Sequence, residues 1–304
     1  MGTKKKKRYK NLPKKNPIVL ALPIIVICLL TTIGVLLYIK HINQNKYKFE
    51  TPKNEVHKLP KEAMRQIKAA TTSAIVRVPI LMYHYVEYVR DKRDTIRQSL
   101  DITPFIFEKQ ITTLQDAGYT FMTAKELADV LDGKKELPEK PVLLTFDDGH
   151  WDLDTDVLPI LKKYNVKATA YIVPGFLNQS DFLSTTQLQD VVSSGLVEIG
   201  AHTVHHMWLK GRLLTTVQKE VNDSKTMLEE TLHIPVVSFA YPYGAFDQQA
   251  EDVVKTAKFT NAVSTAPGIM QSTTNRYFLF RLRPGGRTGK TLLSFLEQKT
   301  FTQW

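Results

Sequence analysis

Beyond residue 77, hydrophobic positions fall in short runs that alternate with amphipathic stretches of helical period. Seven of these runs have the length and composition of β-strands. They are Pro79–Met82, Tyr119–Met122, Pro141–Phe146, Ala168–Val173, Val197–Gly200, Val236–Ala240 and Asn261–Ser264. Strands separated by helices usually pair in parallel, so the pattern predicts an α/β fold, either a (β/α) barrel or an open doubly wound sheet.

Several of the intervening helices have recognisable start signals, because Ser, Thr and Asp side chains can accept hydrogen bonds from the first helical N–H groups. These signals are Thr103-Pro104 for a helix to about Ala117, the capping pair Thr123 and Glu126, the capping pair Thr215 and Gln218 for a long helix to about Leu232, and Asp247 for the next helix. The helices are therefore expected to begin at defined positions between the strands.

The hydrophobic pattern differs near the start of the chain, where Ile18 to Ile39 is an uncharged apolar run of 22 residues. As a helix it would be roughly 33 Å long, enough to cross a bilayer. Basic residues precede it, which predicts a cytoplasmic N-terminus and an extracytoplasmic remainder. The alternative is a cleaved signal peptide, but the run is longer than a usual signal core and has no clear cleavage site. We therefore expect a single-pass cell-membrane protein.

The remaining organisation follows from this anchor. Residues 1–17 form a basic cytoplasmic tail, 18–39 the transmembrane helix, 40–76 a polar juxtamembrane stalk and 77–304 the folded domain. Cys28, the single cysteine, lies inside the predicted span, so the exported part has no thiol or disulfide chemistry.

The formal net charge of +11 raises the question of a nucleic-acid partner. Eight of the 41 basic residues lie within residues 1–16, where there is no acidic residue, which leaves 33 basic against 30 acidic side chains in the rest of the chain. Nucleic-acid binding requires basic residues clustered on the folded part. The charge distribution therefore excludes nucleic acid as a partner.

Polar clusters follow several predicted strands, at the end where parallel barrels place catalytic groups. Asp147-Asp148-Gly149 follows one strand; alone, it could also be a solvated turn. His202-Thr203-Val204-His205-His206 follows another. Two histidines four residues apart, together with an aspartate, suit Zn²⁺ or a similar divalent ion with one open position. A lone buried histidine is usually structural, but three within five residues favour metal binding.

The segments TFDDG and HTVHH resemble the first two motifs of the polysaccharide deacetylase family, the NodB-homology or family 4 carbohydrate esterases. The resemblance covers roughly Val78 to Arg283 and implies a distorted (β/α) barrel. It also implies that Asp147 is the general base and that Asp148, His202 and His206 bind the metal. His205 occupies a non-ligand position of the motif.

The segment Phe239 to Gly244 is similar to the third family motif, in which the backbone N–H of Tyr243 would donate to the developing oxyanion. Its alternative is a proline-containing turn. The family commonly has an arginine at the position of Ala240. Arg281, in the segment Phe280 to Arg283, falls at the last strand position and could replace that arginine; the alternative is a surface salt bridge.

No histidine follows His233, so the usual C-terminal catalytic acid of the family has no counterpart. Instead, the segment Pro79 to His84 resembles the N-terminal motif of the poly-N-acetylglucosamine (intercellular adhesin) deacetylase subgroup, whose motifs are circularly permuted. This resemblance implies that His84 is the general acid; the alternative is a structural core histidine.

The resemblance therefore implies a metal-dependent hydrolase of amide bonds that removes acetyl groups from a poly-N-acetylglucosamine-like polysaccharide. Two alternatives stay open. One is a peptidoglycan N-acetylglucosamine deacetylase, which the same anchor would serve. The other is a catalytically inactive glycan-binding or scaffold protein, against which Asp147, Asp148, His202 and His206 argue because all four are present.

Overall fold

The computed structural model describes residues 75–298, except 90 and 92. Its longer strands are β2 (Ile80–Tyr83), β5 (Thr120–Met122), β6 (Pro141–Phe146), β7 (Ala168–Ile172), β8 (Val197–Ala201), β9 (Ser238–Ala240), β10 (Asn261–Pro267) and β12 (Leu279–Arg281). Short strands are β1 (Val76–Arg77), β3 (Tyr85–Val86), β4 (Asp101–Ile102) and β11 (Met270–Gln271). Each of the seven predicted runs overlaps one of these strands, although β2, β8 and β10 extend beyond the predicted ends.

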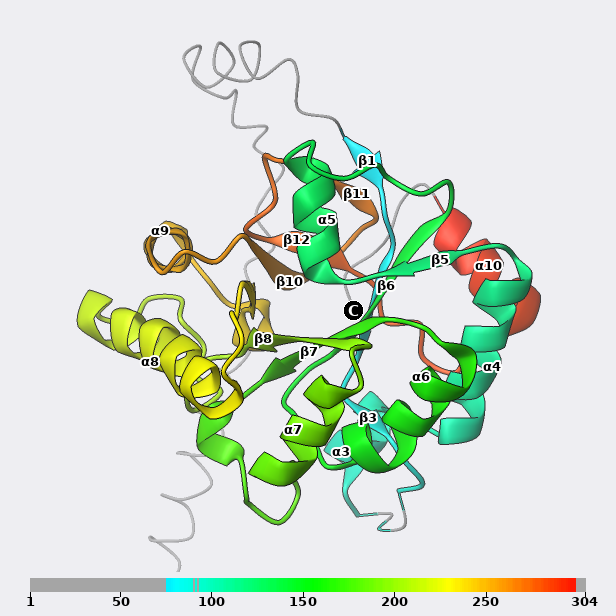
Figure 1. Ribbon diagram of the computed structural model, residues 1–304, viewed down its shortest axis with the longest axis horizontal. Helices are drawn as coiled ribbons and strands as arrows, with labels where there is room; N and C mark the ends of the chain where they lie inside the picture. The colour runs from blue at the N-terminus through cyan, green and yellow to red at the C-terminus, as the bar shows by residue number, and fades with distance from the viewer. Residues whose placement is uncertain (1–74, 90, 92, 299–304) are drawn as a thin grey trace, which may run out of the picture. The chain divides into compact units, whose positions relative to one another are not determined.

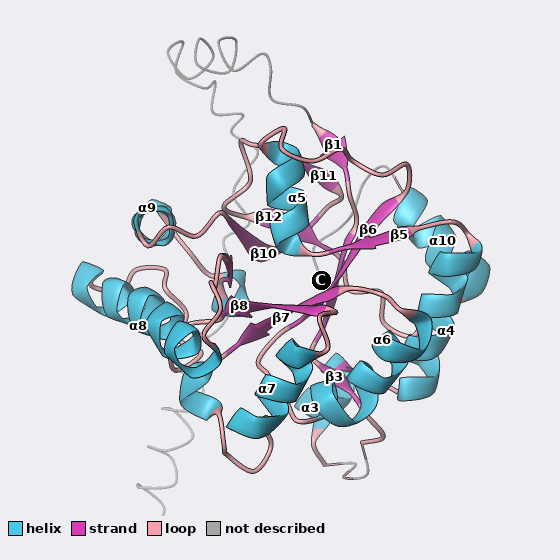
Figure 2. Ribbon diagram, in the orientation of Figure 1, coloured by secondary structure: helices cyan, strands magenta, loops and turns pink. Residues whose placement is uncertain are grey.

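The helices are α3 (Thr95–Leu100), α4 (Pro104–Asp116), α5 (Ala124–Leu131), α6 (Leu158–Tyr164), α7 (Thr185–Ser193), α8 (Leu214–Leu232), α9 (Gln248–Thr256) and α10 (Gly289–Glu297). Three further helical turns are η1 (Leu153–Val157), η2 (Pro174–Phe176) and η3 (Pro242–Gly244). Figure 1 shows helices surrounding the central strands, and the colouring of Figure 2 separates the two kinds of element.

The longer strands form one parallel sheet that closes on itself. Its order is β12-β10-β9-β8-β7-β6-β2, with β5 paired to the first half of β6. The seam lies between β2 and the residues after β12, where Met82 N–H donates to Leu282 O and Leu282 N–H donates to Ile80 O, both at 2.8 Å. The fold is therefore the distorted (β/α) barrel implied by the family resemblance, and the open doubly wound sheet is excluded.

The predicted caps are present at three of the four helices. Thr103 and Asp247 accept from the first turns of α4 and α9, and Thr123 forms a reciprocal capping box with Glu126 at α5. The capping box predicted at Thr215 is wrong. Leu213 is the N-cap of α8, and its carbonyl accepts from Thr216 and Val217, so Thr215 already lies within the first turn.

One end of the barrel interior is filled by α5. Leu127 on this helix is fully buried and belongs to the same hydrophobic cluster as Ile80, Leu143 and Val263, which come from three barrel strands. At the N-terminus of α5, the Lys125 N–H donates to the Glu198 carboxylate at the beginning of β8. The start of the strands is therefore closed, and the opposite, carboxyl end is left for a site.

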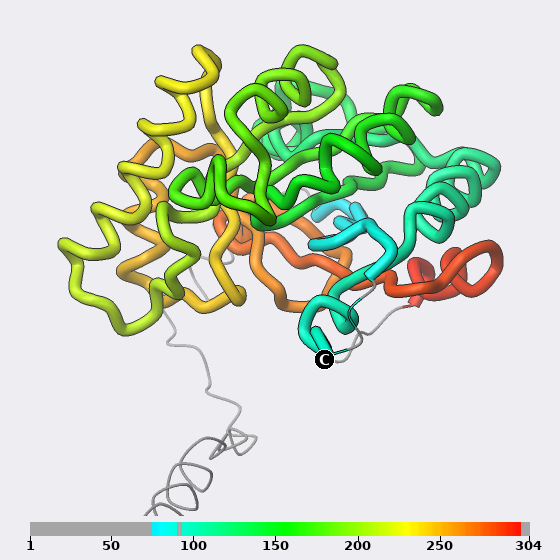
Figure 3. Tube along the Cα trace, turned by 90° about the horizontal axis from the view of Figure 1, so that it is seen from below, coloured from blue at the N-terminus to red at the C-terminus, as the bar shows by residue number. Residues whose placement is uncertain are grey.

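The outer helices are spread around this barrel. In Figure 3, seen from below, α8 lies at one side of the domain and α10 at the opposite side. Among the described residues, no helix combines the length and the apolar composition that a bilayer crossing requires. The predicted transmembrane segment Ile18–Ile39 lies outside the described residues.

Candidate active site

The carboxyl end of β6 holds a buried ion pair. Asp147 directly follows this strand, and its N–H donates to Tyr83 O of β2. Two nitrogens of the Arg281 guanidinium each donate to one Asp147 oxygen at 2.7 Å. Arg281 also donates to Ser264 O and is completely buried, so it is not a surface salt bridge. Burial alone would raise the pKa of Asp147, but the adjacent Arg281 guanidinium brings it below its ordinary value.

His84 lies beside this pair, immediately after β2. Its Nε2 is 4.0 Å from Asp147 Oδ2. Burial is the main cause that lowers the pKa of His84 to about 4, and the positive charges of Arg283 and Arg281 act in the same direction, against Asp147 and Asp148. The imidazole is therefore uncharged at neutral pH, with one nitrogen able to donate and the other to accept a proton.

The second carboxylate, Asp148, turns toward two histidines. Nε2 of His202 and of His206 lie 3.4 and 3.1 Å from Asp148 Oδ1, and one donor atom from each residue falls within 4.8 Å of the others. This oxygen is buried and makes no well-formed hydrogen bond with any described residue. Two imidazole nitrogens and a carboxylate oxygen converging in this way can hold a divalent metal ion.

The far nitrogens of both histidines have oxygen partners. His202 Nδ1 lies 2.7 Å from Ala240 O, and His206 Nδ1 lies 3.1 Å from the Tyr243 hydroxyl. Such contacts fix the imidazole so that Nε2 faces the ligand position. Although burial alone would raise it, the pKa of Asp148 is well below its ordinary value because three histidines contact it: His150, His202 and His206.

The backbone that carries these groups is unusual. Four non-glycine residues here have positive φ angles: Asp148 (76°), Thr203 (59°), His206 (53°) and Tyr243 (59°). This conformation is unfavourable for residues with a Cβ and persists only where surrounding contacts impose it. Gly149, which follows Asp148, is also left-handed, at φ 83°.

One contact that holds the HTVHH loop comes from α8. The buried Glu220 carboxylate accepts from Val204 N–H at 2.9 Å and from His205 N–H at 3.0 Å. Its other oxygen lies 2.8 Å from His205 Nδ1. His205 is 62 % exposed and outside the metal-ligand group, as the family motif implies. The sequence pattern gave no reason to single out Glu220.

His150, also not anticipated, contacts the other side of Asp148. Its ring lies between those of Tyr85 and Phe182, with centroid distances of 4.0 and 4.7 Å. His150 Nε2 is 3.5 Å from Asp148 Oδ2. Its position directly after the DDG turn is a signal that could have indicated this role.

These groups line a pocket of about 310 Å³ at the carboxyl end of the barrel. The structure thus brings together all seven residues singled out as site candidates: His84, Asp147, Asp148, His202, His206, Tyr243 and Arg281. The Tyr243 side chain is 64 % exposed at the rim, where its ring contacts that of His206. The arrangement combines a buried carboxylate, an uncharged imidazole and a candidate metal site around one cavity, as hydrolysis requires.

Comparison with known proteins places this geometry in a family. Residues 134–262 match the family model described as polysaccharide deacetylase. A protein of Bacillus subtilis (strain 168), named as a polysaccharide deacetylase, YxkH, is 31 % identical over 254 residues, which cover 81 % of this chain and 88 % of the relative. The chain belongs to the polysaccharide deacetylase family. As a member it is a hydrolase that acts on amide bonds.

Two further relatives are informative. The poly-β-1,6-N-acetyl-D-glucosamine N-deacetylase of Staphylococcus aureus is 28 % identical over 189 residues, which cover 58 % of this chain and 65 % of the relative. The solved structure of the Streptococcus pyogenes deacetylase PplD in complex with acetate is 28 % identical, with a TM-score of 0.68; the match covers 74 % of this chain and all of that one. Both belong with deacetylases, in agreement with the family assignment.

Proposed function

We propose that this polysaccharide deacetylase is a metal-dependent N-deacetylase of a poly-N-acetylglucosamine-like cell-surface polysaccharide, and that it releases acetate. The observation that carries the proposal is the meeting, in one pocket, of the Asp147–Arg281 pair, His84 and the convergent donor atoms of Asp148, His202 and His206. The polymer is suggested by the similarity to the Staphylococcus aureus enzyme, whose name specifies that substrate.

Asp148, His202 and His206 would hold Zn²⁺ or another divalent transition metal. Their nitrogen and carboxylate donors match the ligands that such ions prefer, and three protein ligands leave positions open for water and substrate. A bound divalent ion would polarise the acetamide carbonyl and acidify the attacking water.

The remaining chemistry falls to residues of the chain. Asp147 is kept ionised by Arg281, so it can accept a proton from the water as the new carbon–oxygen bond forms. His84 starts uncharged, so the proton that it gives the leaving amine must reach it during the reaction. Asp147, whose Oδ2 lies 4.0 Å from His84 Nε2, can pass on the proton that it has taken from the water. The Tyr243 N–H would donate to the oxyanion. The carbon–nitrogen bond then breaks, giving acetate and an amine.

We also propose the location predicted from the sequence, with the catalytic domain outside the cell membrane and the segment Ile18–Ile39 as its anchor. The uncharged run and the basic residues before it support this placement. Protease added to intact cells should then cleave the chain beyond about residue 45, and the protein should fractionate with membranes. A soluble mature form that starts after Ile39 would show a signal peptide instead.

The catalytic proposal is tested by measuring acetate release from β-1,6-linked N-acetylglucosamine oligomers, β-1,4-linked oligomers and peptidoglycan. We expect turnover to be fastest on the β-1,6-linked oligomers. Faster turnover on peptidoglycan would support the alternative substrate, and no acetate from any of the three, in protein with metal bound, would indicate an inactive glycan-binding protein.

The role of His84 can be tested separately. His84→Ala should slow N-deacetylation by a factor of about 10²–10⁴. It should slow hydrolysis of an activated acetate ester much less, because the leaving group of such an ester needs no proton. Equal losses on both substrates would mean that His84 has a structural role.

A further inference from the structure

Arg283 lies two residues after Arg281, and both side chains are directed to the same end of the barrel. The backbone of Arg283 is held in place because the preceding residue, Leu282, hydrogen-bonds to β2 at the barrel seam. Its side chain lines the active-site pocket together with His84 and Tyr243. A cationic group is thereby placed at the pocket wall, although the proposed reaction steps do not use it.

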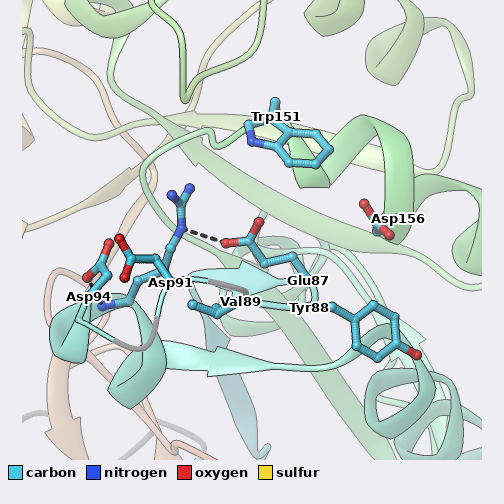
Figure 4. Close-up of a pocket in the computed structure, with 8 residues that line it drawn as sticks. Glu87, Tyr88, Val89, Asp91, Asp94, Trp151 and Asp156 are labelled. Atoms are coloured by element: carbon cyan, nitrogen blue, oxygen red, sulfur yellow. Dashed lines mark hydrogen bonds and ion pairs between the residues drawn. The ribbon is translucent and has the colours of Figure 1, made fainter.

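Three arginines at this end of the barrel differ in their partners. Arg281 donates to both oxygens of Asp147. Arg97, at a neighbouring hollow, pairs with Glu87. The dashed line that ends on the labelled Glu87 carboxylate in Figure 4 marks this ion pair. Arg283, by contrast, makes no hydrogen bond or ion pair with any residue in the described part of the chain, and its Nε is buried without a partner. Burial and the nearby Arg281 lower the pKa of Arg283, but an arginine keeps its proton in such a setting.

The charges around the pocket explain what Arg283 can bind. Asp147 is neutralised by Arg281, and Asp148 would be outweighed by a divalent ion. No other acidic side chain lines the pocket within the described residues. With the metal bound, the pocket is therefore net positive and offers unused guanidinium donors. Such a pocket favours a ligand rich in acceptor oxygens and disfavours an ammonium group.

We propose that Arg283 is a substrate-binding residue that donates hydrogen bonds to acceptor oxygens of the acetylated sugar unit and repels units that have already lost their acetyl group. This inference rests on the proposed function, since it assumes an amino-sugar polymer. N-deacetylation turns a neutral acetamide into an amine that is protonated at neutral pH. The product therefore carries a positive charge, which Arg283 repels. The same side chain thus favours both the release of the product and the binding of units that are still acetylated.

The test compares Arg283→Gln with wild-type enzyme on an N-acetylglucosamine pentamer, and measures inhibition by the fully deacetylated pentamer. For Arg283→Gln we expect KM to rise roughly tenfold, with kcat within about threefold of wild type, because a hydrogen bond to a charged donor is lost in both ground and transition states. Inhibition by the cationic pentamer should become several-fold stronger. Arg283→Lys keeps the positive charge, so inhibition by the deacetylated pentamer should stay as weak as in wild type. Its KM should lie between those of wild type and Arg283→Gln.

Arg93→Gln is the matched control, because Arg93 is 91 % exposed and its replacement removes the same charge. This control should leave unchanged both the KM for the acetylated pentamer and the inhibition constant of the deacetylated pentamer. A folding defect in Arg283→Gln would weaken the binding of substrate and of inhibitor together. A higher KM combined with stronger inhibition by the deacetylated pentamer therefore identifies substrate binding by Arg283. Unchanged KM and unchanged inhibition in an active enzyme would overturn the inference, whereas an inactive wild-type enzyme would overturn the proposed function itself.

Discussion

The two halves of the active site are built in different ways. The base half, Asp147 with Arg281, lies at the ends of barrel strands, is fully buried and is held by paired charges and strand hydrogen bonds. The candidate metal half lies on loops, with Asp148, Thr203 and His206 in left-handed backbone conformations. Such a conformation costs about 1–3 kcal/mol per non-glycine residue.

This difference indicates where each half is vulnerable. The base half depends on a rigid frame and on the mutual neutralisation of two buried charges. The metal half depends on contacts that hold strained loops in place, above all the Glu220 carboxylate beneath the HTVHH loop. Changes at the metal half should therefore affect metal affinity, and changes at the base half should affect turnover with metal still bound.

The largest effect is expected from removing a ligand of the metal half. His206→Ala should lower metal affinity by more than about a hundredfold and abolish acetate release, since even the supporting partners of metal ligands are worth 10–100-fold. Metal content by elemental analysis checks this result. His205→Ala, at the exposed neighbour, is the control: it removes one contact to Glu220 but no metal ligand, so acetate release at saturating metal should be kept. Full activity of His206→Ala after exhaustive chelation would contradict the metal assignment.

The next largest effect is expected at the base half. Asp147→Asn should retain the metal but lower kcat by a factor of about 10²–10⁴, because asparagine cannot accept the water's proton. Turnover and metal content are measured on the same preparation. Loss of metal together with turnover would show that the two halves are not independent.

A smaller effect should follow from loosening the loop. Glu220→Gln leaves three donors facing a side chain that no longer carries a negative charge, and we expect metal affinity to fall about tenfold. At saturating metal, kcat should return to near the wild-type value. Glu230→Gln, on the exposed side of the same helix, is the matched control. If Glu220→Gln competes with a chelator for the metal as well as wild type does, the loop keeps its conformation without the Glu220 carboxylate.

The smallest effect is expected from Asp152, which accepts from Val86 N–H in β3, next to His84. Burial raises the pKa of Asp152 to about 6, so the folded protein favours the protonated carboxyl group. The stability that this preference contributes is fully present below about pH 4 and is lost as the pH rises through about 6. Asp152→Asn can still accept that hydrogen bond but cannot ionise. We expect its Tm to exceed that of wild type by a few degrees at pH 7.5 and by less at pH 5, with activity unchanged.

The sequence alone predicted the fold class, the two main motifs of the site and several helix caps. The alternation of strand and helix patterns predicted a parallel α/β fold, because burial imposes a period on hydrophobic residues wherever an element packs on one side. The DDG and HTVHH segments indicated chemistry because adjacent carboxylates and closely spaced histidines are local in sequence. Local capping signals were also read correctly at Thr103, Thr123 and Asp247.

Other features depend on contacts between distant parts of the chain. Arg281 lies 134 residues from Asp147, and only barrel closure brings the guanidinium onto the carboxylate. Glu220 is one of several acidic residues on an amphipathic helix, and its burial follows from how α8 packs on the loop. That Leu213 and not Thr215 is the N-cap of α8 was likewise decided by backbone hydrogen bonds to Leu213 O.

The sequence by itself therefore determined the fold class, the family motifs and the residue types available for catalysis, because these depend on local periodicity and on side-chain chemistry. Only the tertiary structure decided that the barrel closes between β2 and Leu282, that Arg281 neutralises Asp147, and that Arg283 is left without a partner among the described residues. The physical reason is that a charge's role depends on its neighbours and its burial, and both are set by packing between residues far apart in the chain.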